Sequence, residues 1–171
     1  EIGIPYGLTA RRLLIALITR SVRDKSRVIR CGSIHKLMNE AGLGISGKTY
    51  KSFQRMLLQL ATMNINVWFV PEGSSKGVLY RGGMFDALSV DIEETAQMSF
   101  KFVPDTIVLT KDFYNEVVKD KAVPFIAETI KKATSPLEHD VLIWLLHRTP
   151  RLTRNTAISW KGMYNQFAVP D

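Results

Sequence analysis

Residues 41–50, AGLGISGKTY, contain the residue types that cradle a phosphate group. Gly42 is followed by four residues and then by Gly47, Lys48 and Thr49, which is the G-x-x-x-x-G-K-T pattern of a nucleotide-binding P-loop. In such a loop the backbone N–H groups surround the phosphates, and the following helix points its positive end at them. The pattern raises the question of whether this chain hydrolyses a nucleotide or uses these residues in another structure.

The residues around this pattern do not supply what a P-loop needs. A buried strand must run into the glycines, but residues 35–41, HKLMNEA, are amphipathic with a helical period. A carboxylate for magnesium is poorly supplied, because ALSVD, residues 87–91, is a weak candidate for a strand that ends in an aspartate, Asp91. No further series of alternating strands and helices would build a parallel sheet. We therefore interpret Gly42, Gly44 and Gly47 as a tight turn between two helices, with a P-loop nucleotidase as the alternative.

Apolar periodicity predicts the elements on both sides of this turn. It predicts helices over 8–23, 33–43 and 47–63, a short strand at 27–30, and strands at 65–70 and 78–81 that form a hairpin. In the helix at 8–23, Arg11, Arg12, Arg20 and Arg23 mostly fall off the apolar stripe. Ser33 is an expected N-cap, and Gly42 is expected to end its helix under the cover of Leu43. The order of elements is that of a winged helix, a helix-turn-helix followed by a β-hairpin wing, so the predicted fold class is α+β.

The second half of the chain suggests a partial copy of the first. We expect a strand at 98–104, helices at 110–120 and 135–148, and a helix or an irregular apolar segment at 123–134. Thr110 is the candidate N-cap of the first of these helices, and Ser135, followed by Pro136 and Glu138, marks the start of the helix at 135–148. The helix at 135–148 is apolar on nearly all sides and is expected to be central and buried. Three segments form a weak internal repeat: 13–20 resembles 141–148, 27–30 resembles 151–154, and 33–43 resembles 159–169. The predicted domains are a winged helix at 1–105 and the helical start of a second, truncated winged helix at 106–171.

The charge distribution favours a polyanionic partner. The net charge is +7, but residues 1–82 carry 13 lysines and arginines against four acidic residues, a local net charge of +9. Residues 83–171 carry 10 basic and 12 acidic residues, a net charge of −2. A concentrated positive field attracts nucleic acid, although a solvated basic surface is the alternative.

Composition argues against several other classes of protein. The single Cys31 forms no internal disulfide and favours the cytoplasm, and three scattered histidines suggest no metal site. His139 and Asp140 are adjacent on a predicted helix and point apart, so we expect no catalytic residues, no cofactor and no enzyme activity. No apolar run approaches the ~18 residues of a membrane span, so we expect no membrane partner. The chain does not begin with Met, which favours a fragment or a processed product.

Three segments together resemble plasmid-encoded RepA-type replication initiators. They are GIPYGLTARRLLIALITRSVRDKSR (3–27), SIHKLMNEAGLGISGKTYKSFQRMLLQL (33–60) and SPLEHDVLIWLLHRTPRLTRNTAISWKGMYNQF (135–167). The resemblance implies two winged-helix domains that bind repeated double-stranded DNA sites at a plasmid origin. It also implies a shift between dimer and monomer, host replication proteins as partners, and no nucleotide chemistry. This chain differs from the family pattern by ending before a second recognition helix.

The candidate DNA contacts lie mainly on the helix after the glycines. Spacing places Lys48, Lys51, Ser52, Arg55 and Gln59 on the face opposite the apolar stripe. On such a face a recognition helix presents base-edge donors and phosphate contacts, and Lys48, Lys51, Ser52 and Arg55 are the first candidates. The predicted DNA-binding residues are Lys48, Thr49, Lys51, Ser52, Arg55, Lys76, Arg11 and Arg12. The alternatives are an ordinary solvated face, or a winged-helix transcriptional repressor or dimerisation module without a role in initiation.

Overall fold

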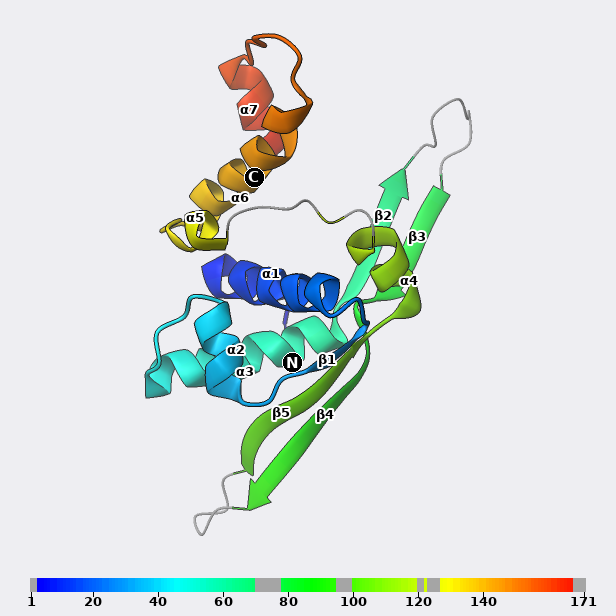
Figure 1. The fold of residues 1–171 in the computed structure, drawn as a ribbon, viewed down its shortest axis with the longest axis vertical. Coiled ribbons are helices and arrows are strands. Elements are labelled where there is room, and N and C mark those ends of the chain that lie inside the picture. Colours follow the sequence, from blue (N-terminus) through cyan, green and yellow to red (C-terminus); the bar gives the residue numbers. More distant parts are fainter. Residues whose placement is uncertain (1–2, 70–77, 95–99, 120–121, 123–126, 168–171) are drawn as a thin grey trace. The chain divides into compact units, whose positions relative to one another are not determined.

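The computed structural model describes residues 3–69, 78–94, 100–119, 122 and 127–167, which form a mixed α+β structure (Figure 1). The chain divides into two compact units, unit 1 (Glu1–Ala122) and unit 2 (Val123–Asp171). Unit 1 contains α1 (Gly7–Arg23), β1 (Val28–Arg30), α2 (Ile34–Glu40), α3 (Gly47–Thr62), β2 (Asn64–Phe69), β3 (Val78–Gly83), β4 (Phe85–Glu94), β5 (Phe100–Leu109), α4 (Lys111–Phe113) and the π-helical turn η1 (Tyr114–Val118). Unit 2 contains α5 (Ala127–Lys131), α6 (Pro136–Arg148), the 3₁₀ turn η2 (Thr149–Arg151) and α7 (Trp160–Phe167).

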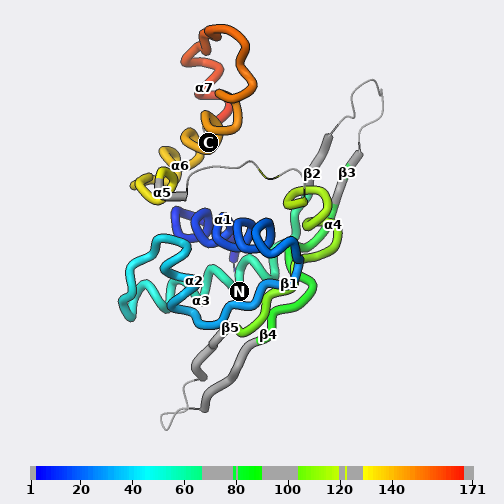
Figure 2. Tube along the Cα trace, in the orientation of Figure 1, coloured from blue at the N-terminus to red at the C-terminus, as the bar shows by residue number. Residues whose placement is uncertain are grey.

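Helices α1, α2 and α3 share one apolar core, and the path of the chain through them can be followed in Figure 2. Each helix carries apolar side chains at three- and four-residue spacing, which places them on one face. Burial of these stripes against one another removes the apolar surface from water and holds the three helices together. The buried side chains that they contribute are Ala10, Leu13, Ala16, Leu17, Ile34, Leu37, Met38, Phe53, Met56, Leu57 and Leu60.

A three-stranded antiparallel sheet, in the order β1-β5-β4, completes this core. β1 pairs with β5 so that Ile29 lies opposite Ile107, and both side chains are buried. β2 and β3 form a separate two-stranded antiparallel sheet, in which Asn64 lies opposite Gly83. In Figure 1 the β2–β3 and β4–β5 hairpins extend in different directions from the helices of unit 1.

The hairpin predicted at 65–70 and 78–81 is therefore present as β2–β3, but it is not the one that pairs with β1. That role belongs to β4–β5, of which the sequence predicted only the second strand, at 98–104. The pairing of β4 with β5 shifts between Phe85 and Ala87 and again between Ser89 and Val90. Such bulges break the two-residue alternation that identifies a strand, so β4 left only the weak signal at 87–91.

Gly42 closes the turn between α2 and α3, as its position predicted. It has a φ of +66°, and its N–H donates to the carbonyl of Asn39 at 2.9 Å. The N–H of Leu43 donates to the carbonyl of Met38, also at 2.9 Å. These two bonds form a Schellman motif, in which a left-handed residue ends a helix and the next apolar residue covers it. Leu43 is buried, so the prediction of a turn under apolar cover is confirmed.

Replacing Gly42 by alanine should lower the free energy of unfolding by about 1–2 kcal/mol, because a Cβ atom is disfavoured in the left-handed conformation. Gly44→Ala is the matched control, since Gly44 has no positive φ and an added Cβ would meet no atom within 4 Å. The control should be neutral or should stabilise by up to ~1 kcal/mol, because alanine restricts the unfolded chain. Urea denaturation measures both variants, and equal losses would contradict the assignment.

Unit 1 continues past the predicted domain boundary at residues 105 and 106. The strand β5 runs on to Leu109, and the Oγ1 of Thr110 accepts a hydrogen bond from the N–H of Phe113 at 3.2 Å, which is the predicted cap. Phe113 and Val118 are buried in the same core as the three helices. The helix predicted at 110–120 is thus split between α4 and η1, and it belongs to unit 1 because its apolar residues complete that core.

In unit 2, α6 begins as the sequence predicted but is not a buried central helix. The Oγ of Ser135 accepts a hydrogen bond from the N–H of Glu138 at 3.1 Å, and Pro136 occupies the first turn. Among the described residues of α6, however, His139 alone is buried, while Leu137 and Leu145 are exposed. The apolar run was interpreted as interior, but the described elements of unit 2 are too few to surround it.

Candidate nucleic-acid interface

The outer face of α3 carries four exposed polar side chains, Lys48, Lys51, Ser52 and Arg55. Their spacing of i, i+3, i+4 and i+7 places them on one side of the helix, as predicted. Phe53 and Leu57, on the other side, are completely buried. The packing of α3 against the core therefore fixes which of its residues face solvent.

Among the described residues, no ion pair neutralises the basic side chains of this face. α3 contains no Asp or Glu, and in the part of the chain that the structure describes no carboxylate pairs with Lys48, Lys51 or Arg55. The side chain of Glu40, at the end of α2, is engaged by Arg20. The N-terminus of a helix also carries partial positive charge, which adds to the field of Lys48 and Lys51 in the first turns of α3. The face is suited to an anionic ligand.

Thr49 has a different task from its neighbours. Its N–H donates to the Oγ of Ser46 at 3.2 Å, and its Oγ1 lies 2.8 Å from the same oxygen. Ser46 is therefore the N-cap of α3, a role that the sequence analysis did not assign, although a serine directly before a helix is a standard signal. The hydroxyl of Thr49 supports the start of the helix, so its predicted contact with DNA has a competing internal partner.

The polar face is shorter than the sequence predicted. Gln59 was placed on the outer face with Arg55, but its side chain is buried. A Cβ atom added to Gly3 would lie 3.2 Å from the Nε2 atom of Gln59, so the N-terminal segment covers this part of α3. The segment that covers Gln59 is distant from it in the sequence, so helical periodicity could not predict that this side chain is buried.

Arg11 and Arg12 of α1, which the sequence predicted to contact DNA, donate hydrogen bonds to backbone carbonyls of the protein. The Nη1 of Arg11 donates to the carbonyl of Gly7 at 3.2 Å, and the Nη1 of Arg12 donates to the carbonyl of Gly42 at 2.9 Å. Arg20, which the sequence placed away from the apolar stripe, is only 3% exposed. Lys76, the eighth predicted DNA contact, lies outside the described residues.

His35 of α2 and Tyr50 of α3 form an aromatic pair next to this face. The ring of His35, an exposed residue of α2, lies 6.3 Å from that of Tyr50 at an interplanar angle of 58°. Tyr50 is adjacent to Lys51 on α3. In the sequence His35 is one of three scattered histidines, and the ring contact with Tyr50 is what brings it beside the candidate interface.

The geometry around Gly42 contradicts the P-loop alternative. The residues before Gly42 form α2, and the chain turns at Gly42 into a linker of four residues before α3. No strand runs into the glycines, so the phosphate-binding arrangement of strand, loop and helix does not form there. Lys48 is exposed on the outer face of α3.

Cys31 is buried between β1 and α2, and its burial raises the pKa of the thiol to about 11. We expect it to remain unmodified by a disulfide reagent at pH 8 in the folded protein, because the reactive thiolate is disfavoured and shielded. One equivalent of thiol should react once urea unfolds the chain. Absorbance during reaction with an aromatic disulfide measures both states, and rapid reaction of the folded protein would contradict the burial.

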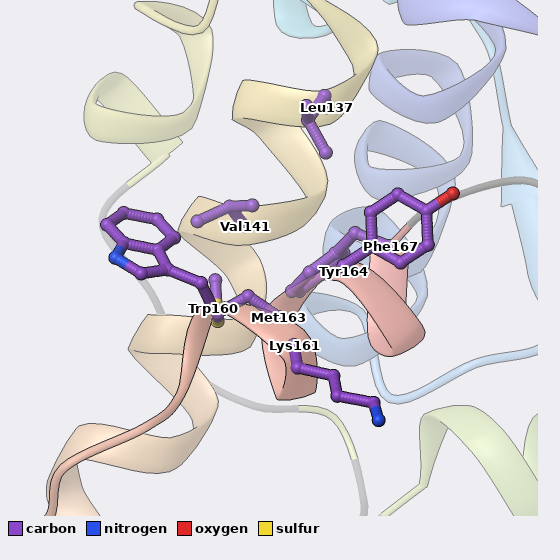
Figure 3. Close-up of a pocket in the computed structure, with 7 residues that line it drawn as sticks. All are labelled: Leu137, Val141, Trp160, Lys161, Met163, Tyr164 and Phe167. Atoms are coloured by element: carbon purple, nitrogen blue, oxygen red, sulfur yellow. The ribbon is translucent and has the colours of Figure 1, made fainter.

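Unit 2 carries an apolar groove of about 830 Å³ between α6 and α7 (Figure 3). Trp160 is 88% exposed, Tyr164 68% and Leu137 56%. The ring of Trp144 meets that of Phe167 edge-on at 5.7 Å, which holds α7 against α6. The residues that line the groove are Leu137, Val141, Trp160, Lys161, Met163, Tyr164 and Phe167. The groove and the exposed rings beside it form an apolar surface on unit 2.

Among the described residues, no helix is long and apolar enough to span a membrane, and no three metal-ligating side chains form a group.

Comparison with known proteins finds a likeness of fold. No family model matches the chain, and no curated protein matches it. A selenomethionine structure of domains 2 and 3 of RctB matches 96% of this chain and 67% of its own, with a TM-score of 0.63 and 16% identity. A structure of the RctB fragment 155–483, also domains 2–3, matches over 93% and 61%, with a TM-score of 0.59 and 15% identity. This chain thus spans about two thirds or less of those chains.

Proposed function

We propose that this protein is a DNA-binding replication initiator, and that unit 1 binds double-stranded DNA through the outer face of α3. The observation that carries the proposal is the face itself, where Lys48, Lys51 and Arg55 are exposed together without an acidic partner among the described residues. Lysine and arginine on one helix face bind phosphates and guanine edges in the major groove. The role in initiation is supported by the resemblance to RepA-type initiators and by the fold shared with domains 2–3 of RctB.

In this proposal unit 1 is a winged helix. α2 and α3 are its helix-turn-helix, with α3 as the recognition helix, and β1, β4 and β5 are its small sheet. The wing is then the β4–β5 hairpin, because that hairpin pairs with β1, and β2–β3 is an additional hairpin between α3 and β4. A recognition helix of this kind places its N-terminal residues against base edges, which assigns Lys48 and Lys51 the deepest positions.

Unit 2 is, in the same proposal, a partial second winged helix. The repeat aligns Ile34, Leu37, Met38 and Ala41, in and directly after α2, with Trp160, Met163, Tyr164 and Phe167 of α7. The residues at α2 are buried in the core that α1, α2 and α3 share, whereas their α7 counterparts line the open groove. The groove thus lies on the face of α7 whose counterpart in unit 1 is covered by that core. The repeat is incomplete, because the described residues 151–154, the counterpart of β1, contain no strand.

The two aligned positions Ile34 and Trp160 should respond differently to truncation. Ile34→Ala should lower the free energy of unfolding by about 2–4 kcal/mol, because it removes packed side-chain atoms from a core. Trp160→Ala should change the free energy by less than about 0.5 kcal/mol, because the side chain is exposed. Urea denaturation followed by circular dichroism compares them. A large loss from Trp160→Ala would show that the groove is filled in solution.

Binding to DNA across a salt series tests the proposed function. Fluorescence anisotropy would compare a duplex of direct repeats from beside the gene with a shuffled duplex of the same composition. We expect tighter binding to the repeats and a log–log salt slope of about −0.9 for each phosphate contact. An affinity that does not depend on the salt concentration, or an equal affinity for both duplexes, would refute a specific DNA-binding role.

A replication assay separates an initiator from a repressor or a dimerisation module. We expect a plasmid that carries the repeats to be lost when the gene is inactivated, and to be restored by the protein supplied in trans. A repressor would leave the plasmid replicating and would change only transcription. A homodimer and host replication proteins are further predictions of the resemblance, which sedimentation and pull-down from a host extract would test.

A further inference from the structure

Two arginines of α1 contact the protein around α2 rather than facing solvent. Arg12 donates from Nη1 to the carbonyl of Gly42, just after α2. Arg20 donates from Nε to the carboxylate of Glu40, the last residue of α2. The Nη1 of Arg20 also donates to the carbonyl of Arg30 at 2.8 Å, in the segment before α2. The chain entering α2 and the chain leaving it are therefore both tied to α1.

The contact of Arg12 lies at the residue that sets the direction of α3. Gly42 has left-handed backbone geometry, and its carbonyl belongs to the turn that leads to Ser46 and α3. A hydrogen bond from a charged donor to a carbonyl is stronger than one between neutral groups. The Nε atom of Arg12 is also shielded from solvent, so the guanidinium is held against the protein.

We propose that Arg12 is a positioning residue: it fixes the turn between α2 and α3, and so aims the outer face of α3, without itself contacting DNA. This inference rests on the proposed function of α3 and assigns Arg12 a different role from the phosphate contact expected from the sequence. A phosphate contact would affect all DNA sequences equally, whereas a misplaced α3 affects base contacts most, because they require the closest geometry.

The test compares Arg12→Met with Arg11→Met, which removes the same charge from the neighbouring residue. Arg11 donates to Gly7 at the start of its own helix and does not reach the α2–α3 turn through that bond. In the absence of DNA, Arg12→Met should speed hydrogen exchange of the amides of Gly42 and Leu43 about tenfold, because their N–H groups are hydrogen-bonded in the turn that Arg12 holds. Arg11→Met should leave those amides unchanged.

Binding measurements then separate positioning from direct contact. With Arg12→Met, the ratio of specific to non-specific affinity should fall about tenfold while the salt slope stays the same, because no phosphate contact is lost. If the salt slope falls by about 0.9 and exchange at Gly42 and Leu43 is unchanged, Arg12 is a phosphate contact and the inference is wrong. Unchanged exchange with an unchanged affinity ratio also overturns it.

A second variant keeps the result interpretable. Arg12→Lys retains the positive charge but replaces the planar guanidinium by an ammonium group, whose hydrogen-bond donors have a different geometry. We expect it to speed exchange at Gly42 and Leu43 as Arg12→Met does, whereas a charge-only role would leave exchange and affinity as in the original protein. If the original protein does not bind the repeats, the proposed function fails, and the exchange data still decide whether Arg12 holds the turn.

Discussion

Replacing Lys51 and Arg55 together by alanine should weaken binding to the repeat duplex about a hundredfold, because each such contact contributes on the order of 1–3 kcal/mol. The log–log salt slope should become shallower by about 1.8 if both side chains neutralise phosphates. Both residues are exposed, so the midpoint of urea unfolding should stay close to that of the original protein. Fluorescence anisotropy at several salt concentrations gives the affinity and the slope together.

The matched control removes the same charge elsewhere on unit 1. Lys111 and Lys119 are exposed at the two ends of the α4–η1 segment. The Lys111→Ala/Lys119→Ala protein loses two positive charges, yet we expect it to lose less than about fivefold in affinity, because screening limits charges beyond a Debye length of ~10 Å. Equal losses in the two double variants would mean that net charge, and not the face of α3, governs binding.

The sequence predicted those features of unit 1 that depend on local signals. The turn at Gly42 follows from a glycine placed after a helical stripe, and it is found with the expected left-handed backbone. The two faces of α3 follow from periodicity alone, because a helix that buries Phe53 and Leu57 must expose Lys51 and Arg55. The helix-turn-helix segment of unit 1 and the exposure of the candidate face were therefore open to prediction, while the use of this face in DNA binding stays a prediction.

The features that escaped prediction depend on segments distant in the sequence. Gln59 and Arg20 are polar residues that periodicity assigned to solvent, but both are buried. Gln59 is covered by the segment at Gly3, and Arg20 is neutralised by Glu40. Burial of a polar group becomes favourable only when a partner satisfies it, and no local pattern names that partner.

Apolar content alone also failed to predict which side chains of unit 2 are buried. The run in α6 has the composition of an interior helix, yet Leu137 and Leu145 are exposed. The composition of a helix shows whether its side chains are apolar enough to be buried. Whether they are buried depends on the elements that pack against the helix. The same limit applies to α7, whose repeat positions match the buried positions of α2 but line an open groove.

Replacing Glu40 by alanine should lower the free energy of unfolding of unit 1 by about 3 kcal/mol, because it leaves the buried charge of Arg20 without its carboxylate. Arg20 is 3% exposed and Glu40 29%, so water can replace only part of the lost interaction. The exposed pair of Arg27 and Asp86 provides the control, since its side chains are 42% and 48% exposed. Asp86→Ala should cost less than about 1 kcal/mol.

A double variant distinguishes an unpaired charge from lost packing. Arg20→Met in the Glu40→Ala background removes the buried charge and keeps much of the side-chain volume, and we expect it to recover about half of the loss or more. Part of the loss should persist, because the carbonyls of Arg30 and Cys31 then lack their donor. Urea denaturation of the single, double and control variants gives all the differences. A loss below 1 kcal/mol from Glu40→Ala, or no recovery in the double variant, would show that the ion pair does not hold α2 against α1.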